Sequence, residues 1–581
     1  MKRTIHASEF GIRPDTMQDV TFQVYRMLSQ ARTDDELHFE KGRYDFWPHK
    51  AFERFYFISN HGNSGLKRCA FPLIGFNNLT IDGGGAEFIF HGVISPFVIE
   101  GSSRITLRNF SIDWERPMLS QGELISVESE HFDIYLPEQY PFDVVNDRMI
   151  FFGEDWKYEL SGWIEMDALT NSPAYQSGDH PFGSRLDAFK AVRVSERVVR
   201  FEGEVKRRPR LGNQLILKHG PRLNPGILIT DSSNVGIRDV AIYSANGMGV
   251  IAQRSGHIDI HAVNVIPNPL TDRRFSVSAD AVHIVNCRGE IKLTSCTFRN
   301  QMDDPLNIHG IYGKIAQRID DRTLLVEWAH EEQKGVEIAA AGDWISLVRG
   351  DSFAEFGRFR CKDMTTFSKD YMMIQSEAVI PPDIKPGDVI ENASWIADLV
   401  LKDCTMAGNR ARGPLLTASG KVLVENNTIN VPGAGIFIEG DAHYWFESGK
   451  VNDVTIRNNR FEECTYCPQW GMAVIVISPK ITNPSIEGYH RNIHIHDNRF
   501  KMFDSNLLKA SFVDHLRFEN NRIEVSEAYE KHGKMSHIVE VHHCVNVVVS
   551  NNKLESGFNN IGLVNGEKVD ISLRHPRGGG G

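Results

Sequence analysis

The sequence lacks the features that mark membrane-spanning, nucleic-acid-binding and disulfide-stapled proteins. No run of about 18 apolar residues occurs in the 581-residue chain, which argues against a transmembrane helix. The formal net charge is −11 without a basic stripe, which argues against a nucleic-acid partner. The eight cysteines are scattered, so a disulfide scaffold is not expected.

The two ends of the chain also carry little fold signal. The start, MKRTIHASEF, has no apolar segment of the kind found in signal peptides. We therefore expect either a cytoplasmic protein or a processed form of a secreted or periplasmic one. The end, RHPRGGGG, belongs to a stretch at 571–581 that we expect to be disordered.

A repeat runs along the chain, which is too long for one ordinary compact core. Each copy begins with a short strand in which apolar and polar residues alternate. Three residues after the central apolar residue comes a fixed position that is often asparagine, and two residues later another apolar residue, as in KVLVENNTI and DVTIRNNRF. The central apolar residues recur after 23 residues from Leu401 to Val424 and after 31 from Phe518 to Val549. Such periods predict a right-handed parallel β-helix, in which stacked coils bury one continuous core.

The fixed position predicts how the coils are joined. Five copies have asparagine there, and stacking would form a ladder whose amides hydrogen-bond along the axis. Ordinary hairpin turns are the alternative reading of the repeated Asn-Asn pairs. The asparagines are Asn427, Asn459, Asn498, Asn521 and Asn552, and two earlier copies have Cys296 and Cys404 instead.

Other segments complete the predicted architecture. A second strand after each turn, as in DAVHIVNCRG and DPLNIHG, should form a second sheet. The segment RPDTMQDVTFQVYRMLSQA predicts an amphipathic helix that starts at a Thr16-x-x-Asp19 signal and caps the open end of the solenoid. The repeat vanishes twice, which indicates two inserted antiparallel β-barrel-like domains. The expected domains are 1–115 (cap and first coils), 116–222 (insertion 1), 223–310 (coils with the candidate site), 311–396 (insertion 2), 397–570 (C-terminal coils) and the tail.

Asp303 and Asp304 stand side by side in QMDDPLNIHG, where like charges repel. Asp280 precedes Asp303 by 23 residues, or one coil, so stacking brings three carboxyl groups together. Clustered carboxyls cannot all ionise readily, and one should keep its proton near neutral pH. Hydrolysis of a glycosidic bond needs such an acid and base. Solvated turn aspartates and a calcium site are the alternatives.

Five motifs resemble the α-1,3-galactosidases of glycoside hydrolase family 110: KGRYDFWP, LTIDGGGAEFIFHG, SIDW, DAVHIVNCRG and DDPLNIHG. The resemblance runs over most of the chain, both insertions included. It implies a parallel β-helix with two β-barrel insertions. It also implies release of terminal α-1,3-linked galactose with inversion, from blood group B-type determinants, with linear Gal-α-1,3-Gal as a further candidate substrate. The family's essential aspartates match Asp280, Asp303 and Asp304.

The three aspartates also resemble those of polygalacturonases, another group of β-helix enzymes. By that analogy Asp303 is the general acid, while Asp280 and Asp304 position and deprotonate the water. Inverting sites separate the acid and base carboxyls by roughly 6.5–9.5 Å. Carboxyl groups and water suffice for this chemistry, so we expect no metal and no organic cofactor.

Residues on nearby coils are candidates for sugar contacts, each with a structural role as the alternative. His283, Asn307 and His309 share the two aspartate coils, but the sequence does not fix which of them face outward. Arg410 and Arg412 lie on the next coil and would bind galactose hydroxyls, tune a carboxyl group or form surface salt bridges. The remaining candidates are Glu439, Trp114, Trp470, Trp328 and Trp344, and most of these tryptophans are expected in the core.

The sequence therefore favours an exo-acting α-1,3-galactosidase whose partner is a galactose-terminated oligosaccharide or glycoconjugate. One alternative is another β-helix carbohydrase, such as a polygalacturonase-like hydrolase or a lyase. The other is a non-catalytic glycan-binding solenoid. A homo-oligomer is compatible with the sequence. Cys464 and Cys467 form a lone C-x-x-C, which is more typical of a coil turn than of a zinc site.

Overall fold

The computed structural model describes residues 3–62, 65–484 and 488–573, and strands dominate its regular structure. Of the stretch expected to be disordered, residues 574–581 lie outside the described residues, whereas Ile571 is buried. Within the described ranges, no helix is long and apolar enough to cross a membrane.

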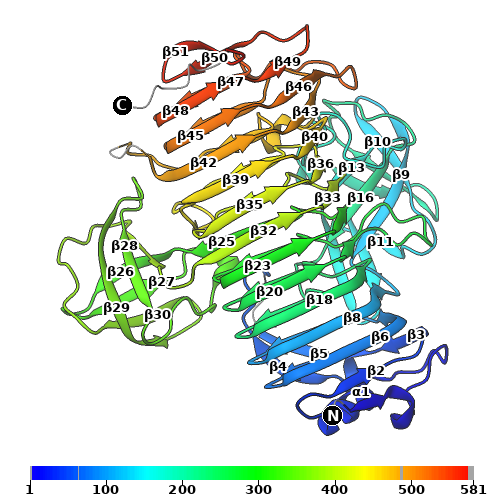
Figure 1. The fold of residues 1–581 in the computed structure, drawn as a ribbon. Coiled ribbons are helices and arrows are strands. Elements are labelled where there is room, and N and C mark those ends of the chain that lie inside the picture. The colour runs from blue at the N-terminus through cyan, green and yellow to red at the C-terminus, as the bar shows by residue number, and fades with distance from the viewer. Residues whose placement is uncertain (1–2, 63–64, 485–487, 574–581) are drawn as a thin grey trace.

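Parallel strands stack coil upon coil into one long sheet (Figure 1). β32 (Ala397–Lys402), β35 (Lys421–Glu425) and β39 (Asp453–Arg457) are three successive members. Leu401 pairs with Val424, and Val424 pairs with Ile456. The central apolar residues of the repeat are thus in register. The same register continues through β42 (His490–His496), β45 (Val513–Glu519) and β48 (Val545–Ser550).

The strands after each turn form a second parallel sheet, which confirms the parallel β-helix. β19 (Val250–Gln253), β22 (Val282–Val285) and β25 (Leu306–Ile311) pair in that order. Ile284 and Ile308 point into the apolar core that fills the solenoid. Strand alternation therefore directs the residues between these positions outward.

The asparagine ladder connects the C-terminal coils. Asn427 Nδ2 donates to Asn459 Oδ1 at 3.0 Å, and Asn459 donates in the same way to Asn498. The pattern continues from Asn498 to Asn521 at 3.1 Å and on to Asn552 at 3.0 Å. Each Oδ1 also accepts the backbone N–H of the preceding rung, so the buried amides are paired with one another as predicted.

The ladder extends into the cysteine rungs. The backbone N–H of Cys404 donates to Asn427 Oδ1 at 2.9 Å, and the N–H of Cys296 points at Cys404 Sγ at 3.4 Å. A thiol thus occupies the place of the amide. Elsewhere, Cys464 and Cys467 are both buried and donate to backbone carbonyl oxygens.

The N-terminal helix is shorter than the sequence predicted. α1 spans Thr21–Gln30 and contacts β5 (Gly65–Ile74) at the N-terminal end of the solenoid (Figure 1). The predicted start at Thr16 was wrong, because Asp15 and Met17 have φ values of 59° and 55°, in the left-handed region that a right-handed helix excludes.

The first insertion is an antiparallel sheet with its own apolar core. Its strand order is β11-β12-β13-β16-β9-β10-β15-β14. The sequential bounds are β9 (Leu119–Val127), β10 (His131–Tyr135), β11 (Phe142–Val145), β12 (Arg148–Gly153), β13 (Trp156–Met166), β14 (Lys190–Arg193), β15 (Val198–Glu202) and β16 (Gln214–His219).

The second insertion closes into a barrel in the order β26-β27-β30-β29-β28-β31. Trp328 lies in its core. Figure 1 shows the two insertions on different sides of the solenoid, both beside its central coils. The bounds are β26 (Gly313–Arg318), β27 (Thr323–Glu327), β28 (Trp344–Val348), β29 (Glu355–Thr366), β30 (Tyr371–Ser376) and β31 (Val389–Asn392).

Candidate active site

The three aspartates lie where two neighbouring coils enter the second sheet. Asp280 lies two residues before the start of β22, and Asp303 and Asp304 lie three and two residues before the start of β25. Val282 pairs with Leu306, so the two corners are stacked. The backbone N–H of Asp304 also donates to Asp280 Oδ1 at 3.3 Å. A spacing of one coil thus brings the three aspartates together. Because they lie at corners and not within strands, adjacent side chains need not point to opposite faces.

The cluster is compact and poorly exposed. Each carboxyl group has one oxygen within 4.8 Å of an oxygen of the other two. The side chains of Asp280 and Asp304 are 6% and 3% exposed, whereas Asp303 is 14% exposed. Asp303 is therefore the carboxyl most open to a ligand.

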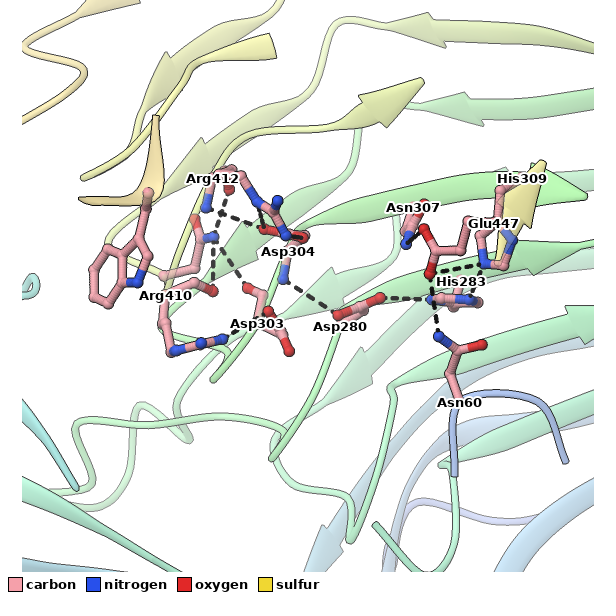
Figure 2. Close-up of polar contacts among 12 residues, drawn as sticks. Asn60, Asp280, His283, Asp303, Asp304, Asn307, His309, Arg410, Arg412 and Glu447 are labelled. Atoms are coloured by element: carbon pink, nitrogen blue, oxygen red, sulfur yellow. Dashed lines mark hydrogen bonds and ion pairs between the residues drawn. The ribbon is translucent and has the colours of Figure 1, made fainter. Parts of the chain in front are cut away.

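Arginines surround the two adjacent aspartates (Figure 2). Arg222 and Arg410 contact the two oxygens of Asp303 at 2.5 and 2.9 Å. Arg412 donates to Asp304 through its guanidinium at 3.0 Å and through its backbone N–H at 3.0 Å. In the described structure, Arg410 and Arg412 therefore bind carboxylates rather than forming isolated surface pairs.

Burial and ion pairing separate the three carboxyls. Burial raises the pKa of Asp280 to about 8, and the nearby charge of Asp303 adds to this shift. Burial also raises the pKa of Asp304 to about 7, although Arg412 opposes it. Burial would raise the pKa of Asp303 too, but Arg410 and Arg222 lower it to about 2. Near neutral pH these shifts favour a proton on Asp280 and, less strongly, on Asp304, and an ionised Asp303.

This charge distribution bears on the role expected for Asp303. A general acid must carry a proton when the leaving group departs. The resting ion pairs of Asp303 keep it ionised, so the polygalacturonase analogy alone does not account for its role. The acid assignment therefore needs a step that loads Asp303 with a proton.

The histidines and the asparagine of these coils face outward but are covered. His283, Asn307 and His309 alternate with core residues on β22 and β25, yet they are 1%, 6% and 3% exposed. β38 (Glu447–Ser448) pairs with β25 and brings Glu447 over them. Glu447 Oε1 lies 3.5 Å from His309 Nε2. These three residues are thus buried beneath Glu447, beside the carboxyl cluster.

The remaining candidates are divided between the site and the core. Trp470 donates from Nε1 to Asp179 at 3.1 Å, and Asp179 is the second partner of Arg410 at 2.6 Å. Glu439 lies near Arg412 but forms its ion pair with Lys480 at 2.8 Å. The structure does not bring Trp114 to the site, because this side chain is buried against Phe90 in the solenoid core. Trp328 is likewise core, and Trp344 is half-exposed on β28.

A cleft of about 570 Å³ opens beside the aspartates. The first insertion supplies most of its lining, including Asp179 and Lys218, and Ser278 and Glu332 contribute from other parts of the chain. Arg222 also lines the cleft and contacts Asp303. Arg222 thus connects the cleft to the most exposed carboxyl, although the three aspartates are not themselves among the lining residues.

Comparison with known families agrees with this architecture. Residues 120–215 match the GLAA-B beta-barrel domain I, residues 323–390 match the GLAA-B beta-barrel domain II, and residues 389–574 match a right handed beta helix region. The chain is 33% identical to alpha-1,3-galactosidase B of Bacteroides thetaiotaomicron, over 95% of this chain and 91% of that protein. It is 32% identical to alpha-1,3-galactosidase A of Shewanella woodyi, over 98% and 94%.

The chain belongs to the α-1,3-galactosidase family. The family resemblance and the fold class predicted from the sequence are thereby confirmed. Among solved structures, an exopolygalacturonase from Thermotoga maritima is similar with a TM-score of 0.36 and 10% identity, over 98% of this chain and 93% of that one. That likeness is too low to support an inference.

In this member of the α-1,3-galactosidase family, the structure adds residues to the candidate site that the sequence did not predict. Arg222 follows the last strand of the first insertion, and Asp179 lies in a loop of that insertion. Glu447 and Asn60 come from segments outside the repeat, and Asn60 Nδ2 contacts Glu447 at 3.4 Å. The return of the chain to the solenoid just after residue 219 was the signal that could have pointed to Arg222.

The three aspartates also have the composition of a cation site, since their oxygens converge. The arginines argue against that use. Asp303 and Asp304 already pair with three guanidinium groups, and a divalent cation would be repelled by those positive charges. Oxygen ligands that bind Ca²⁺ are normally free to coordinate. The donor set fits acid–base chemistry better than metal binding.

Proposed function

We propose that this protein is an exo-acting glycoside hydrolase that releases terminal α-1,3-linked galactose by acid–base catalysis at Asp280, Asp303 and Asp304. The observation that carries the proposal is the stacked carboxyl cluster, with its divergent pKa values, in a chain of the α-1,3-galactosidase family. The relatives' names supply the substrate class, a galactose-containing glycan.

Asp303 is proposed as the general acid in the substrate complex. It is the most exposed of the three carboxyls and lies next to the cleft through Arg222. When galactose hydroxyls take over contacts of Arg222 and Arg410, the ion pairs that keep Asp303 ionised are weakened. The proton held by Asp304 then moves to Asp303, whose oxygen lies within 4.8 Å of an oxygen of Asp304. Asp303 passes it to the leaving oxygen.

Asp280 and Asp304 are proposed to orient and deprotonate the attacking water. Asp304 is ionised once its proton has moved, and Arg412 stabilises the resulting charge. The leaving glycan is placed in the cleft lined by the first insertion, so that insertion would determine whether branched group B-type or linear substrates are accepted.

Inversion rests on the family resemblance and not on the carboxyl spacing. The nearest oxygens lie within 4.8 Å, whereas the carboxyls of inverting enzymes are usually about 6.5–9.5 Å apart and those of retaining enzymes about 5–5.5 Å. The anomer first released from a branched group B trisaccharide and from a linear α-1,3-digalactoside, followed by NMR, decides the question. Release of β-galactose supports inversion, and release of α-galactose refutes it.

The roles of the aspartates are tested with asparagine variants on two substrates. Each Asp→Asn change should lower turnover of the natural disaccharide by at least about 10³-fold. With α-galactosyl fluoride, whose leaving group needs no proton, Asp303→Asn should recover much of its activity. Asp280→Asn and Asp304→Asn should not. Recovery by Asp280→Asn in place of Asp303→Asn would reassign the acid.

The alternative activities make different predictions. A uronate-specific hydrolase needs cationic groups free to bind a carboxylate, but the three arginines here are occupied by Asp303 and Asp304. A lyase would release an unsaturated sugar that absorbs in the ultraviolet. A glycan-binding solenoid would bind galactosides and release nothing.

A further inference from the structure

A row of buried side chains continues from Asp280 away from the arginines (Figure 2). His283 Nδ1 lies 2.6 Å from Asp280 Oδ2, and His283 Nε2 lies 2.9 Å from His309 Nε2. His309 Nδ1 lies 2.7 Å from the carbonyl oxygen of Gly310. The row thus has three consecutive hydrogen bonds, each of which needs one hydrogen.

The fixed end of the row determines where those hydrogens lie. A carbonyl oxygen only accepts, so His309 Nδ1 must carry a hydrogen and donate it to Gly310. If His309 is neutral, its Nε2 is a bare acceptor, and His283 must donate from its own Nε2. Neutral His283 then has a bare Nδ1, and Asp280 must be the donor. A protonated Asp280 therefore completes the row.

Two other arrangements use the same number of hydrogens. One of them, an ionised Asp280 beside a His283 that holds hydrogen on both ring nitrogens, is disfavoured by the burial of His283. The second arrangement moves the proton on to His309. The O–H bond of Asp280 breaks as the Nδ1–H bond of His283 forms, and the Nε2–H bond of His283 breaks as the Nε2–H bond of His309 forms. Asp280 becomes a carboxylate and His309 an imidazolium. An ionised Asp280 beside two neutral histidines would leave two bare nitrogens 2.9 Å apart, which is unfavourable.

Glu447 supplies the counter-charge for the second arrangement. Its Oε1 lies 3.5 Å from His309 Nε2, and the amides of Asn60 and Asn307 contact its two oxygens at 3.4 and 3.5 Å. The carboxylate is thus held in place beside the nitrogen that gains the proton. An imidazolium next to a carboxylate is favourable in a poorly solvated site.

We propose that His283 and His309, with Glu447 as counter-ion, form a proton relay that withdraws the proton of Asp280 and so allows Asp280 to act as the base. The relay rests on the role of Asp280 in the proposed hydrolase. His283 and His309 are positioning residues, because they act through Asp280 and not on the sugar.

The relay balances the protons of the proposed reaction. At rest Asp280 holds a proton that a base must lose, and the relay stores it on His309. During hydrolysis the water proton goes to Asp280, while Asp303 gives its own proton to the leaving oxygen. Asp280 afterwards passes that proton to Asp304, which was emptied when it loaded Asp303 and lies within 4.8 Å by its nearest oxygen. The proton stored on His309 then returns through His283 to Asp280. No proton has to enter from solvent in each cycle.

Other charged groups also face the row and set its energetics. Neighbouring negative charge raises the pKa of Asp280, and neighbouring positive charge disfavours a second proton on His283. Burial is the main reason that the pKa of His283 lies well below its ordinary value, which fits a neutral ring at rest. The titratable groups acting on the row are Asp303, Asp304, Arg222, Glu447 and His61.

The kinetic test uses His283→Asn and His309→Gln, which keep an amide in place of one ring nitrogen but cannot pass a proton. Without the relay, Asp280 must lose its proton to solvent with a pKa of about 8, so at pH 6 only about one molecule in a hundred has an ionised base. We expect kcat at pH 6 to fall by about 10- to 100-fold, to recover as the pH passes 8, and KM to change little. A uniform loss at all pH values would overturn the relay.

A control and a second measurement separate this proposal from the proposed function. His490→Asn removes another buried histidine, whose Nδ1 accepts the N–H of Val451 in the C-terminal coils, and should leave the pH profile unchanged. In ¹⁵N-histidine NMR of the unmodified protein, His283 should carry hydrogen on Nε2 and neutral His309 on Nδ1. The opposite tautomer of His283 beside a neutral His309 refutes the relay, whatever substrate the protein hydrolyses.

Discussion

Replacing Asn498 by alanine tests how much one rung of the asparagine ladder contributes to stability. Asn498 is 2% exposed, and its Nδ2 donates to Ile456 O, His496 O and Asn521 Oδ1 at 2.9, 3.0 and 3.1 Å. Its Oδ1 accepts both the backbone N–H and the Nδ2 of Asn459 at 3.0 Å. The change therefore removes five hydrogen bonds at once.

The expected cost follows from the groups left without partners. Asn459 loses the acceptor of its buried backbone N–H, which costs about 1–3 kcal/mol, while the other groups keep alternative partners or lose about 1 kcal/mol. Because Asn459 Nδ2 still donates to Val424 O, the losses do not add fully. We expect Asn498→Ala to lower the free energy of unfolding by about 2–4 kcal/mol.

The assay is urea-induced unfolding followed by tryptophan fluorescence, with turnover measured in parallel. Asn452→Ala is the matched control, since Asn452 is exposed and its Nδ2 also donates to two carbonyl oxygens. The control should cost less than about 0.5 kcal/mol. Equal losses in the two variants would refute the argument that the buried ladder stabilises the coils.

Three further predictions concern the site. Arg412→Met should raise the pKa of Asp304 above about 7 by removing its counter-charge. Because Asp304 must hold the proton that loads Asp303, the basic limb of the pH profile should move to higher pH, and an unchanged basic limb would contradict this. Trp470→Phe removes the hydrogen bond to Asp179 and so loosens the Asp179–Arg410 ion pair. In steady-state assays KM should rise severalfold while kcat is nearly retained. A selective loss of kcat would show instead that the ion pair acts in the chemical step. Dialysis against a chelator should leave turnover within twofold of the untreated protein, whereas loss that Ca²⁺ restores would show that the carboxyl cluster binds a cation.

Features that repeat with the coil were predictable from the sequence. Stacking turns a fixed spacing into a contact, so the 23 residues between Asp280 and Asp303 were enough to bring the carboxyls together. The same rule gave the register from Leu401 to Val549 and the amide ladder. These predictions needed only the period and the chemistry of one position.

Features that depend on long-range placement were not predictable. Asp179 and Arg222 approach Asp303 because a whole insertion packs beside the coil, and no local pattern encodes that packing. The outward phase of His283 and His309 required the strand boundaries, and their burial required the cover supplied by Glu447. The start of α1 was predicted wrongly because residues with a left-handed backbone conformation occur in a segment whose apolar residues have helical periodicity.

Because Asp280 is stacked beneath Asp303, the effect of adding a coil to the solenoid depends on where the coil is added. Coils rise by about 4.8 Å, so one extra coil between Asp280 and Asp303 would separate carboxyls that now lie within 4.8 Å and would break the proton exchange between them. An extra coil beyond Asn521, which follows Glu447 and Trp470 in the chain, would lengthen the ladder by one rung and leave those two residues in place. The solenoid is thus expected to tolerate added coils at its C-terminal end, while the span from 280 to 304 is fixed in length by the site.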